Sequence, residues 1–317
     1  MIYALVIYIR NLLYDIGLLR SRKAVLPTVC IGNLALGGTG KTPHTIHLAR
    51  LLTAAGVRVA VLSLGYGRRT HGFVLAGKKS NALQIGDEPM LIYERLKDIP
   101  VPVAVCKDRL EGVSKLRQLQ PDLQVVLLDD AMQHRRLKPD FTLLLTSADR
   151  PFTADRLLPC GRLRDSRRSA RRADMLILTN CTEQTVVPTE LNALGLPLLK
   201  SEVVYAPLPT LLRPLILTSI ARPDAFVGFV RQTYPEARCL KYADHHCFTE
   251  ADCRHIARVY ADNCCDGIIT TQKDAMRLAV APLSDTLKAA ICPLPIQIQT
   301  DDRRLLQTVL EGIKLGH

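Results

Sequence analysis

A glycine-rich segment near the amino terminus constrains the fold most strongly. It follows an apolar run at Ala24–Asn33, precedes a helical stretch at Pro43–Ala55, and consists of Gly37, Gly38, Thr39, Gly40, Lys41 and Thr42. A strand, a glycine-rich turn and a helix form a phosphate cradle, because backbone N–H groups and the helix N-terminus point at the anion. Lys41 would reach the outer phosphates, and the Thr42 hydroxyl would bind Mg²⁺. The segment predicts a nucleoside triphosphate as ligand.

The loop departs from the usual phosphate-binding pattern at one position. Ala35 stands where the first glycine of such a loop is expected. A short Gly-Lys-Thr pattern also arises by chance, so a plain tight turn between a strand and a helix is the alternative interpretation. The flanking strand and helix favour nucleotide binding.

Apolar runs alternate with helical stretches along the first half of the chain. The strand candidates are Ala24–Asn33, Val57–Leu64, Val101–Cys106, Leu123–Leu128, Phe141–Thr146 and Met175–Thr179. The helix candidates between them are Pro43–Ala55, Asp87–Leu96 and Arg109–Leu119. Continuous apolar strands that alternate with helices predict an α/β fold, with a P-loop NTPase-like parallel sheet and helices on both faces. Ligands of such sheets bind at the carboxyl ends of the strands.

A second α/β pattern follows an irregular, proline-rich stretch at about 182–214. Its strand candidates are Leu215–Thr218 and Gly267–Thr271, and its helix candidates are Pro223–Gln232, Thr249–Tyr260 and a segment after Lys273. We therefore expect three parts. They are an N-terminal helix at 1–23, a P-loop domain with its linker at 24–212, and a smaller α/β domain at 213–317.

The N-terminal segment predicts an amphipathic helix. Its apolar residues repeat at helical spacing and form one face, which comprises Ile2, Leu5, Ile9, Leu12, Ile16 and Leu19. The uninterrupted apolar run ends at Ile9, too early to span a bilayer, and the basic start of a signal peptide is missing. An apolar face followed by Arg20, Arg22 and Lys23 favours a helix lying in an anionic membrane interface. The alternative is a helix packed on the protein's own core.

The composition narrows the class of partner. The net charge is +12, and arginines crowd the stretch 162–172, which suggests an anionic ligand. The chain has no Trp and little aromatic content, which argues against a nucleic-acid-binding surface. Its ten cysteines show no metal-like spacing, so we expect reduced thiols. Phosphorylated substrates and anionic membranes remain as candidate partners, and the sequence indicates no obligate protein partner.

Candidate metal ligands follow the strand at Leu123–Leu128. That strand ends in Asp129 and Asp130, and an apolar strand that ends in Asp downstream of a phosphate loop often supplies a Mg²⁺ contact. For Asp130 a turn-forming role is an equal alternative. Gln133 and His134 lie in the same loop and could reach the phosphates or the substrate.

Two further segments could supply acid–base chemistry. Asp87 opens a helix, where carboxylates often serve as caps, but near a γ-phosphate it could accept the proton of an acceptor hydroxyl. Asp244, His245 and His246 precede another helix, and one of these histidines could pair with a carboxylate across the cleft. Surface histidines at a helix entry are the alternative.

Taken in order, these segments resemble the tetraacyldisaccharide 4'-kinases, the lipid A 4'-kinases of Gram-negative bacteria. The matching segments are Gly32–Asn33, Gly37–Pro43, Leu64–Arg68, Gly86–Pro89, Asp129–His134, Leu157–Asp165, Asp244–Phe248 and Thr271–Ala275. They span nearly the whole chain, and their order is more specific than any one of them. The family also lacks the early glycine of the phosphate loop, which accounts for Ala35.

The resemblance implies transfer of the ATP γ-phosphate to the 4'-hydroxyl of a tetraacylated glucosamine disaccharide 1-phosphate, with Mg²⁺ required. It implies a P-loop kinase domain, a smaller domain that closes over the nucleotide, and work at the cytoplasmic face of the bacterial inner membrane. The implied roles are phosphate and metal binding for Lys41, Thr42, Asp129 and Asp130, base catalysis for Asp87 with His245 or His246, and lipid-side contacts for Arg164 and Asp165.

Some positions differ from the family pattern. Ala131 and Met132 replace a Gly-aromatic pair, and Asp165 and Gln272 stand where Glu is usual. The competing hypothesis is a membrane-associated P-loop ATPase or GTPase switch that transfers phosphate to water. Asp87 and the Asp244–His246 segment favour a dedicated acceptor site instead.

Overall fold

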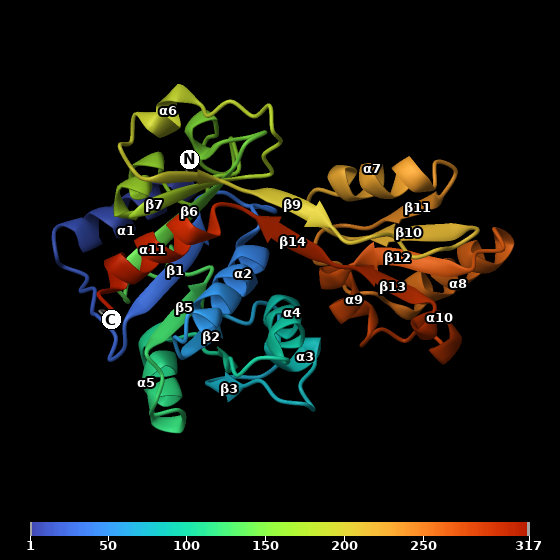
Figure 1. The fold of residues 1–317 in the computed structure, drawn as a ribbon, viewed down its shortest axis with the longest axis horizontal. Coiled ribbons are helices and arrows are strands. Elements are labelled where there is room, and N and C mark those ends of the chain that lie inside the picture. The colour runs from blue at the N-terminus through green and yellow to red at the C-terminus, as the bar shows by residue number, and fades with distance from the viewer. Residues whose placement is uncertain (1, 316–317) are drawn as a thin grey trace.

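The protein folds into two bodies of unequal size that are joined by a narrow two-stranded ribbon (Figure 1). The structure is a computed structural model, and it describes residues 2–315. Met1, Gly316 and His317 lie outside the described residues, as does the side chain of Ile2, so those parts of the expected ranges are not described.

The larger body is built on a sheet that has eight strands within the described residues, in the order β3-β4-β2-β5-β1-β6-β7-β8. The pairs are parallel except for β3 with β4. The strands are β1 (Thr28–Asn33), β2 (Val59–Ser63), β3 (Val74–Leu75), β4 (Val103–Val105), β5 (Val125–Asp129), β6 (Phe141–Ser147), β7 (Met175–Thr179) and β8 (Leu198–Lys200). The main strands are buried along their whole length, as continuous apolar runs predict.

Helices cover both faces of this sheet, as expected. One face packs against α2 (Lys41–Ala54), α4 (Asp87–Leu96) and α11 (Asp302–Ile313). The other packs against α5 (Arg109–Leu119), α6 (Thr189–Asn192) and two 3₁₀ segments, η1 (Phe152–Ala154) and η2 (Arg167–Arg172). A short helix, α3 (Ala82–Ile85), precedes α4. The order of strands and helices is that of a parallel α/β sheet, and their bounds agree with the sequence prediction to within a few residues.

The smaller body is a parallel sheet in the order β11-β10-β12-β13, also covered on both faces. Its strands are β10 (Pro214–Thr218), β11 (Arg238–Lys241), β12 (Gly267–Thr271) and β13 (Ile291–Leu294). Its helices are α7 (Asp224–Thr233) on one face and α8 (Glu250–Asp262), α9 (Gln272–Leu278) and α10 (Asp285–Ala289) on the other.

The chain crosses between the bodies twice, which differs from the expected division at residue 213. β9 (Glu202–Tyr205) leads out of the larger body, and β14 (Ile296–Gln299) pairs with it antiparallel on the way back. The final helix, α11, then packs on the larger sheet, where Leu305, Val309 and Ile313 join the core beside α2. Residues 213–317 are therefore divided between the bodies, because the apolar face of α11 packs against α2, β1 and β6, which lie far earlier in the sequence.

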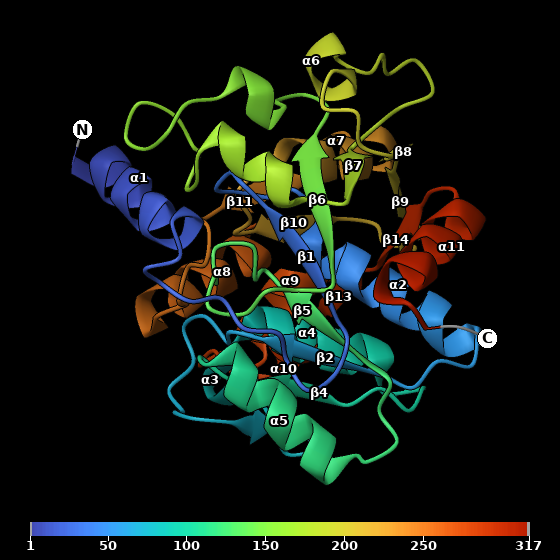
Figure 2. The ribbon, with the colours of Figure 1, turned by 90° about the vertical axis from the view of Figure 1, so that its left-hand side faces the viewer.

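The N-terminal helix, α1 (Ile2–Asp15), lies at the rim of the larger body, on the side away from α2 and α11 (Figure 2). The large side chains of the predicted apolar face are exposed at Leu5, Ile9, Leu12, Ile16 and Leu19. Within the described residues, no helix is both long enough and apolar enough to cross a membrane.

The return of α11 generates a prediction about stability. Leu305 is almost fully buried in the larger body's core, so Leu305→Ala should lower the free energy of unfolding by roughly 2–5 kcal/mol. Amide exchange should accelerate in β1 and β6 more than in β10 and β12. Leu217→Ala, in the core of the smaller body, is the matched control and should give the reverse pattern. Faster exchange confined to β10 and β12 in Leu305→Ala would contradict this packing.

Candidate active site

The phosphate loop lies between β1 and α2, with the geometry that binds anions. Gly40 is the N-cap of α2 at φ 78°, a left-handed conformation that favours glycine. Among the described residues, no side chain caps this helix end, and its first turn contains no acidic residue. The first N–H groups of the helix therefore have no side-chain acceptor and can bind an anion in the loop. The side-chain amide of Asn33, at the end of β1, donates a hydrogen bond to the Thr39 hydroxyl at 2.7 Å and so fixes the position of Thr39.

A cluster of opposite charges lies at the carboxyl end of β5, next to this loop. Lys41 Nζ is 3.7 Å from Asp130 Oδ2, and the Arg164 guanidinium donates to both Asp130 oxygens, at 2.9 Å to Oδ2. Arg164 also donates to the Asn33 side chain. Burial would raise the pKa of Asp130, but Lys41 and Arg164 outweigh it and hold that pKa below its ordinary value. Arg164, expected on the lipid side, thus lies against the phosphate loop.

Asp129 has a different environment although it is adjacent. It is fully buried and accepts hydrogen bonds from the hydroxyls of Thr45 and Ser63, at 3.0 and 3.5 Å. Burial, and then the negative charges of Glu88 and Asp130, raises its pKa to about 7. A buried carboxylate crowded by other acids is a site where a cation would relieve repulsion.

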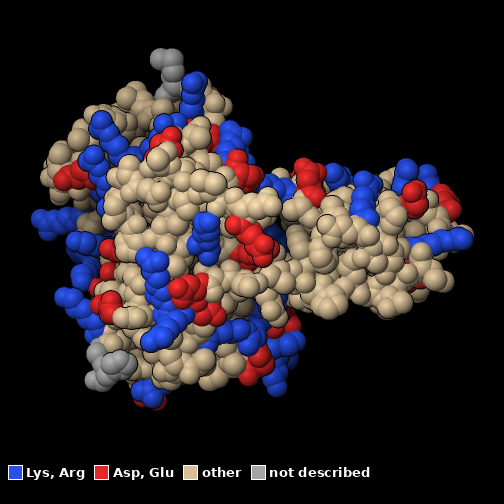
Figure 3. Space-filling model, turned by 45° about the horizontal axis from the view of Figure 1, so that its top comes forward, with Lys and Arg blue, Asp and Glu red and all other residues tan. Residues whose placement is uncertain are grey.

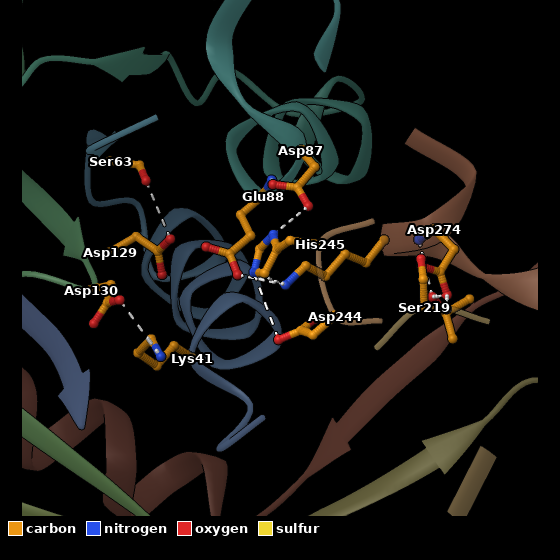
Figure 4. A network of polar contacts seen from close by, with 12 residues as sticks. Lys41, Ser63, Asp87, Glu88, Asp129, Asp130, Ser219, Asp244, His245 and Asp274 are labelled. Atoms are coloured by element: carbon orange, nitrogen blue, oxygen red, sulfur yellow. Dashed lines mark hydrogen bonds and ion pairs between the residues drawn. The ribbon is translucent and has the colours of Figure 1, made fainter. Parts of the chain in front are cut away.

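Asp87 lies in the first turn of α4, and its carboxylate points toward His245 of the smaller body (Figure 4). Its Oδ1 accepts from the Glu88 backbone N–H at 3.0 Å. Its Oδ2 lies 3.2 Å from His245 Nδ1 and 3.6 Å from Arg277 Nε. Arg277 Nε is too distant for a hydrogen bond and the His245 nitrogen is poorly aligned, so this buried oxygen has no hydrogen-bond donor among the described residues. It therefore retains the capacity to accept a proton.

The charge state of Asp87 is set by the cations around it. Burial would raise the pKa of Asp87, but the contact with His245 and the charges of Lys273 and Arg277 outweigh it. The net effect lowers the pKa below the ordinary value for Asp. Asp87 is therefore ionised at neutral pH, the state that a general base requires.

The structure distinguishes between the two candidate histidines. His245, at φ 58°, projects from the smaller body to Asp87, and the edge of the Tyr66 ring packs on it with the ring centres 5.6 Å apart. His246 turns away to Asp252, with 2.9 Å between Nε2 and Oδ2, and stacks on Tyr242. Asp252 forms the capping box of α8, so His246 supports a helix end and does not contact Asp87.

Of the remaining predicted residues, Gln133 lies beneath α1 and His134 lies near the start of α5. The Gln133 amide donates to the Asn33 carbonyl at 2.7 Å, and Arg10 of α1 donates to the Gln133 carbonyl at 2.6 Å. His134 lines a cavity of about 360 Å³ at the start of α5. Burial lowers the pKa of His134 to about 4, which keeps the ring neutral.

Asp165 does not lie at an open substrate surface. Its Oδ1 accepts from Asn11 of α1 at 2.7 Å and from Ser169 at 2.8 Å, and its Oδ2 accepts from Arg172 at 2.6 Å. These donors occupy a carboxylate that is almost fully buried. The expectation that Asp165 contacts substrate is therefore replaced by an anchoring contact for α1.

Three residues of the site, Glu88, Lys273 and Arg277, had no assigned role in the sequence analysis. Glu88 pairs with Lys273 at 2.9 Å, and Arg277 lies beside Asp87 while bonding Asp274 at 2.7 Å. Lys273 and Arg277 are four residues apart on α9 and so share one helix face, a spacing that points to a common partner. Gln272, whose role was open, accepts a hydrogen bond from Arg95 of α4.

Comparisons with known proteins show which family this chain is similar to. A family model for tetraacyldisaccharide-1-P 4'-kinase matches residues 1–314. Relatives named tetraacyldisaccharide 4'-kinase include one from Bacteroides thetaiotaomicron, 38% identical over 94% of this chain and 86% of its own, and one from Flavobacterium johnsoniae, 38% identical over 99% and 96%.

A solved structure is similar over nearly the whole chain. It is LpxK from Aquifex aeolicus in complex with ATP, which has a TM-score of 0.74 and 26% identity and covers 98% of this chain and 96% of that one. The match of the family model over almost every residue, together with relatives of this identity and coverage, shows that the chain belongs to the tetraacyldisaccharide 4'-kinase family.

Proposed function

We propose that this chain transfers the γ-phosphoryl group of ATP to the 4'-hydroxyl of a tetraacylated glucosamine disaccharide 1-phosphate, a step of lipid A biosynthesis. The shared name of its relatives supports the acceptor, and the ATP in the Aquifex complex supports the donor. The observation that carries the proposal is Asp87, an ionised, buried carboxylate whose Oδ2 accepts no hydrogen bond within the described residues and points toward His245 of the smaller body (Figure 4).

In this mechanism Asp87 Oδ2 takes the proton of the 4'-hydroxyl. The sugar oxygen then attacks the γ-phosphorus, the bond to the bridging oxygen breaks, and ADP leaves. His245 orients Asp87, and Lys273 and Arg277 stabilise its charge. A switch that only hydrolyses its nucleotide would not need a base for a sugar hydroxyl that is assembled from both bodies.

The phosphate loop and its cations hold the donor. N–H groups at the start of α2 and the Lys41 ammonium bind the phosphates, and Gly37, Gly38 and Thr39 give the loop its shape. Arg164 holds Asp130 in place. Phosphoryl transfer depends on positioning and charge neutralisation, and these groups supply both.

Thr42, Asp129 and Asp130 fit a magnesium ion. Their donors are hydroxyl and carboxylate oxygens, which Mg²⁺ prefers. Asp129 has a pKa raised to about 7 because it is buried beside Glu88 and Asp130, a crowding of negative charge that a divalent cation would offset. A bound Mg²⁺ would neutralise charge on the phosphate oxygens.

The acceptor's acyl chains place this chemistry at a membrane. We propose that α1 lies in the cytoplasmic interface of the bacterial inner membrane, with its exposed apolar side chains among the lipids. Figure 3 shows Lys and Arg side chains along the left edge of the larger body, the side on which Figure 1 places α1. Such cations attract anionic head groups. Gln133, beneath α1, and His134, near the start of α5, would then contact the sugar or its phosphate.

The role of Asp87 gives the main test. Asp87→Asn should reduce lipid phosphorylation by roughly 10²–10⁴-fold and leave ATP affinity nearly unchanged, because it removes the base and keeps the donor site. Radiolabelled ATP with the disaccharide lipid, followed by chromatography, measures transfer, and calorimetry measures ATP binding.

Asp98→Asn, which alters an exposed ion pair beyond the same helix, is the matched control and should retain transfer. Full turnover in Asp87→Asn would show that another group is the base. Phosphate release without lipid, at the rate seen with lipid, would favour the switch.

The two histidines should separate in a second experiment. His245→Asn keeps a residue that tolerates positive φ, so the backbone is preserved while kcat falls by roughly 10²-fold. His246→Asn loses the contact with Asp252 and should cost about 1 kcal/mol of stability with little change in kcat. Kinetics and thermal melts of both variants measure this. A larger loss of kcat in His246→Asn would reverse the assignment.

The apolar face of α1 should control membrane binding. Leu5→Glu with Ile9→Glu should weaken sedimentation with anionic vesicles by roughly 100-fold, since burying each side chain contributes about 1.5 kcal/mol or more. Both side chains are exposed, so the fold should be unaffected. Leu212→Glu, at an exposed leucine outside α1, is the control and should bind as the unaltered protein does. Equal sedimentation of all three proteins would refute the interfacial helix.

A further inference from the structure

Lys273 contacts the active site from the smaller body at two points. Its ammonium donates to Glu88 Oε1 at 2.9 Å and lies 3.1 Å from His245 Nε2. About a fifth of its side chain is exposed, at 22%. One cation therefore joins the first turn of α4 to the histidine that orients Asp87.

The contact between Lys273 and His245 restricts where the imidazole proton lies. An ammonium group has three donors and no acceptor, so the nitrogen that faces it must carry a lone pair. His245 Nε2 is that nitrogen, which leaves the ring proton on Nδ1. Nδ1 is the atom 3.2 Å from Asp87 Oδ2.

The surrounding charges keep Lys273 protonated. Burial would lower the pKa of Lys273, but Glu88 and Asp87 outweigh it, so the net shift is upward. The other groups facing this cluster are Arg277 of α9, Asp244 at 4.0 Å from His245 Nε2, and the edge of the Tyr66 ring. A doubly protonated His245 would place two cations 3.1 Å apart.

We propose that Lys273 is a positioning residue that holds His245 in the neutral Nδ1–H tautomer. His245 then presents an N–H group, and not a lone pair, to Asp87 Oδ2. The ring does not itself take the sugar proton, because its lone pair is occupied by Lys273. This inference rests on the proposed function in one respect, that Asp87 is the base. The tautomer is set when the smaller body docks on α4, since Lys273 is fixed there by Glu88.

Nitrogen NMR of the full-length protein, labelled with ¹⁵N-histidine, tests the tautomer directly. The signals of His245 are assigned by their loss in His245→Asn. The unaltered protein should show the Nδ1–H pattern at neutral pH. An Nε2–H tautomer, or a doubly protonated ring, would overturn the proposal without any variant of Lys273.

The variant Lys273→Met removes the ammonium and keeps the length of the side chain. His245 should then lose the Nδ1–H form, either to the Nε2–H tautomer or to the imidazolium. Lys241→Met, which removes an exposed ion pair of the same body with Asp224, is the matched control and should leave the tautomer unchanged. Retention of the Nδ1–H form in a folded Lys273→Met protein would show that Lys273 does not set it.

Kinetics distinguish positioning from nucleotide binding. Lys273→Met should lower kcat by roughly 10-fold to 100-fold and leave KM for ATP unchanged. A raised KM for ATP with an unaltered tautomer would make Lys273 a nucleotide contact instead. The NMR experiment does not depend on turnover. If Asp87→Asn retained full transfer, Asp87 would not be the base, but the NMR spectra would still decide whether Lys273 sets the tautomer of His245.

Discussion

The packing of α4 against α9 is the contact on which the active site depends. Asp87 and Glu88 belong to the larger body, and the cations that balance them, Lys273 and Arg277, belong to the smaller one. A buried carboxylate without those cations would tend to protonate and would lose the negative charge that the proposed base requires. The ribbon of β9 and β14 connects the two bodies. The charge pairing between α4 and α9 makes the charge of Asp87 depend on the contact between them.

Buried and half-buried side chains of both charges lie close together at the carboxyl edge of the larger sheet. Lys41 and Arg164 hold the pKa of Asp130 below its ordinary value in spite of burial, whereas burial, together with the charges of Glu88 and Asp130, raises the pKa of Asp129 to about 7. Two neighbouring carboxylates thus differ in environment: Arg164 binds one, and the other is fully buried beside acidic groups. This difference arises from side chains that come from segments far apart in sequence.

The two faces of α1 have different surroundings. The polar face is bonded to the loops beneath it, through Asn11 to Asp165 and through Arg10 to the Gln133 carbonyl. The apolar face remains exposed. If α1 lies in a membrane, these bonds would fix the orientation of the loops that hold Asn33 and Asp130. The site would then face the surface in which an acylated substrate would lie.

The sequence by itself determined the local chemistry: the phosphate loop, the buried parallel strands, the Asp residues after β5, and the carboxylate that opens α4. These features depend on neighbouring residues and on short periodic patterns. The tertiary structure decided what depends on distant partners. It chose His245 over His246, buried Asp165 under α1, returned α11 to the first sheet, and set Lys273 between Glu88 and His245. Contacts between residues a hundred or more positions apart leave no local pattern, because packing and charge balance select them when the chain folds.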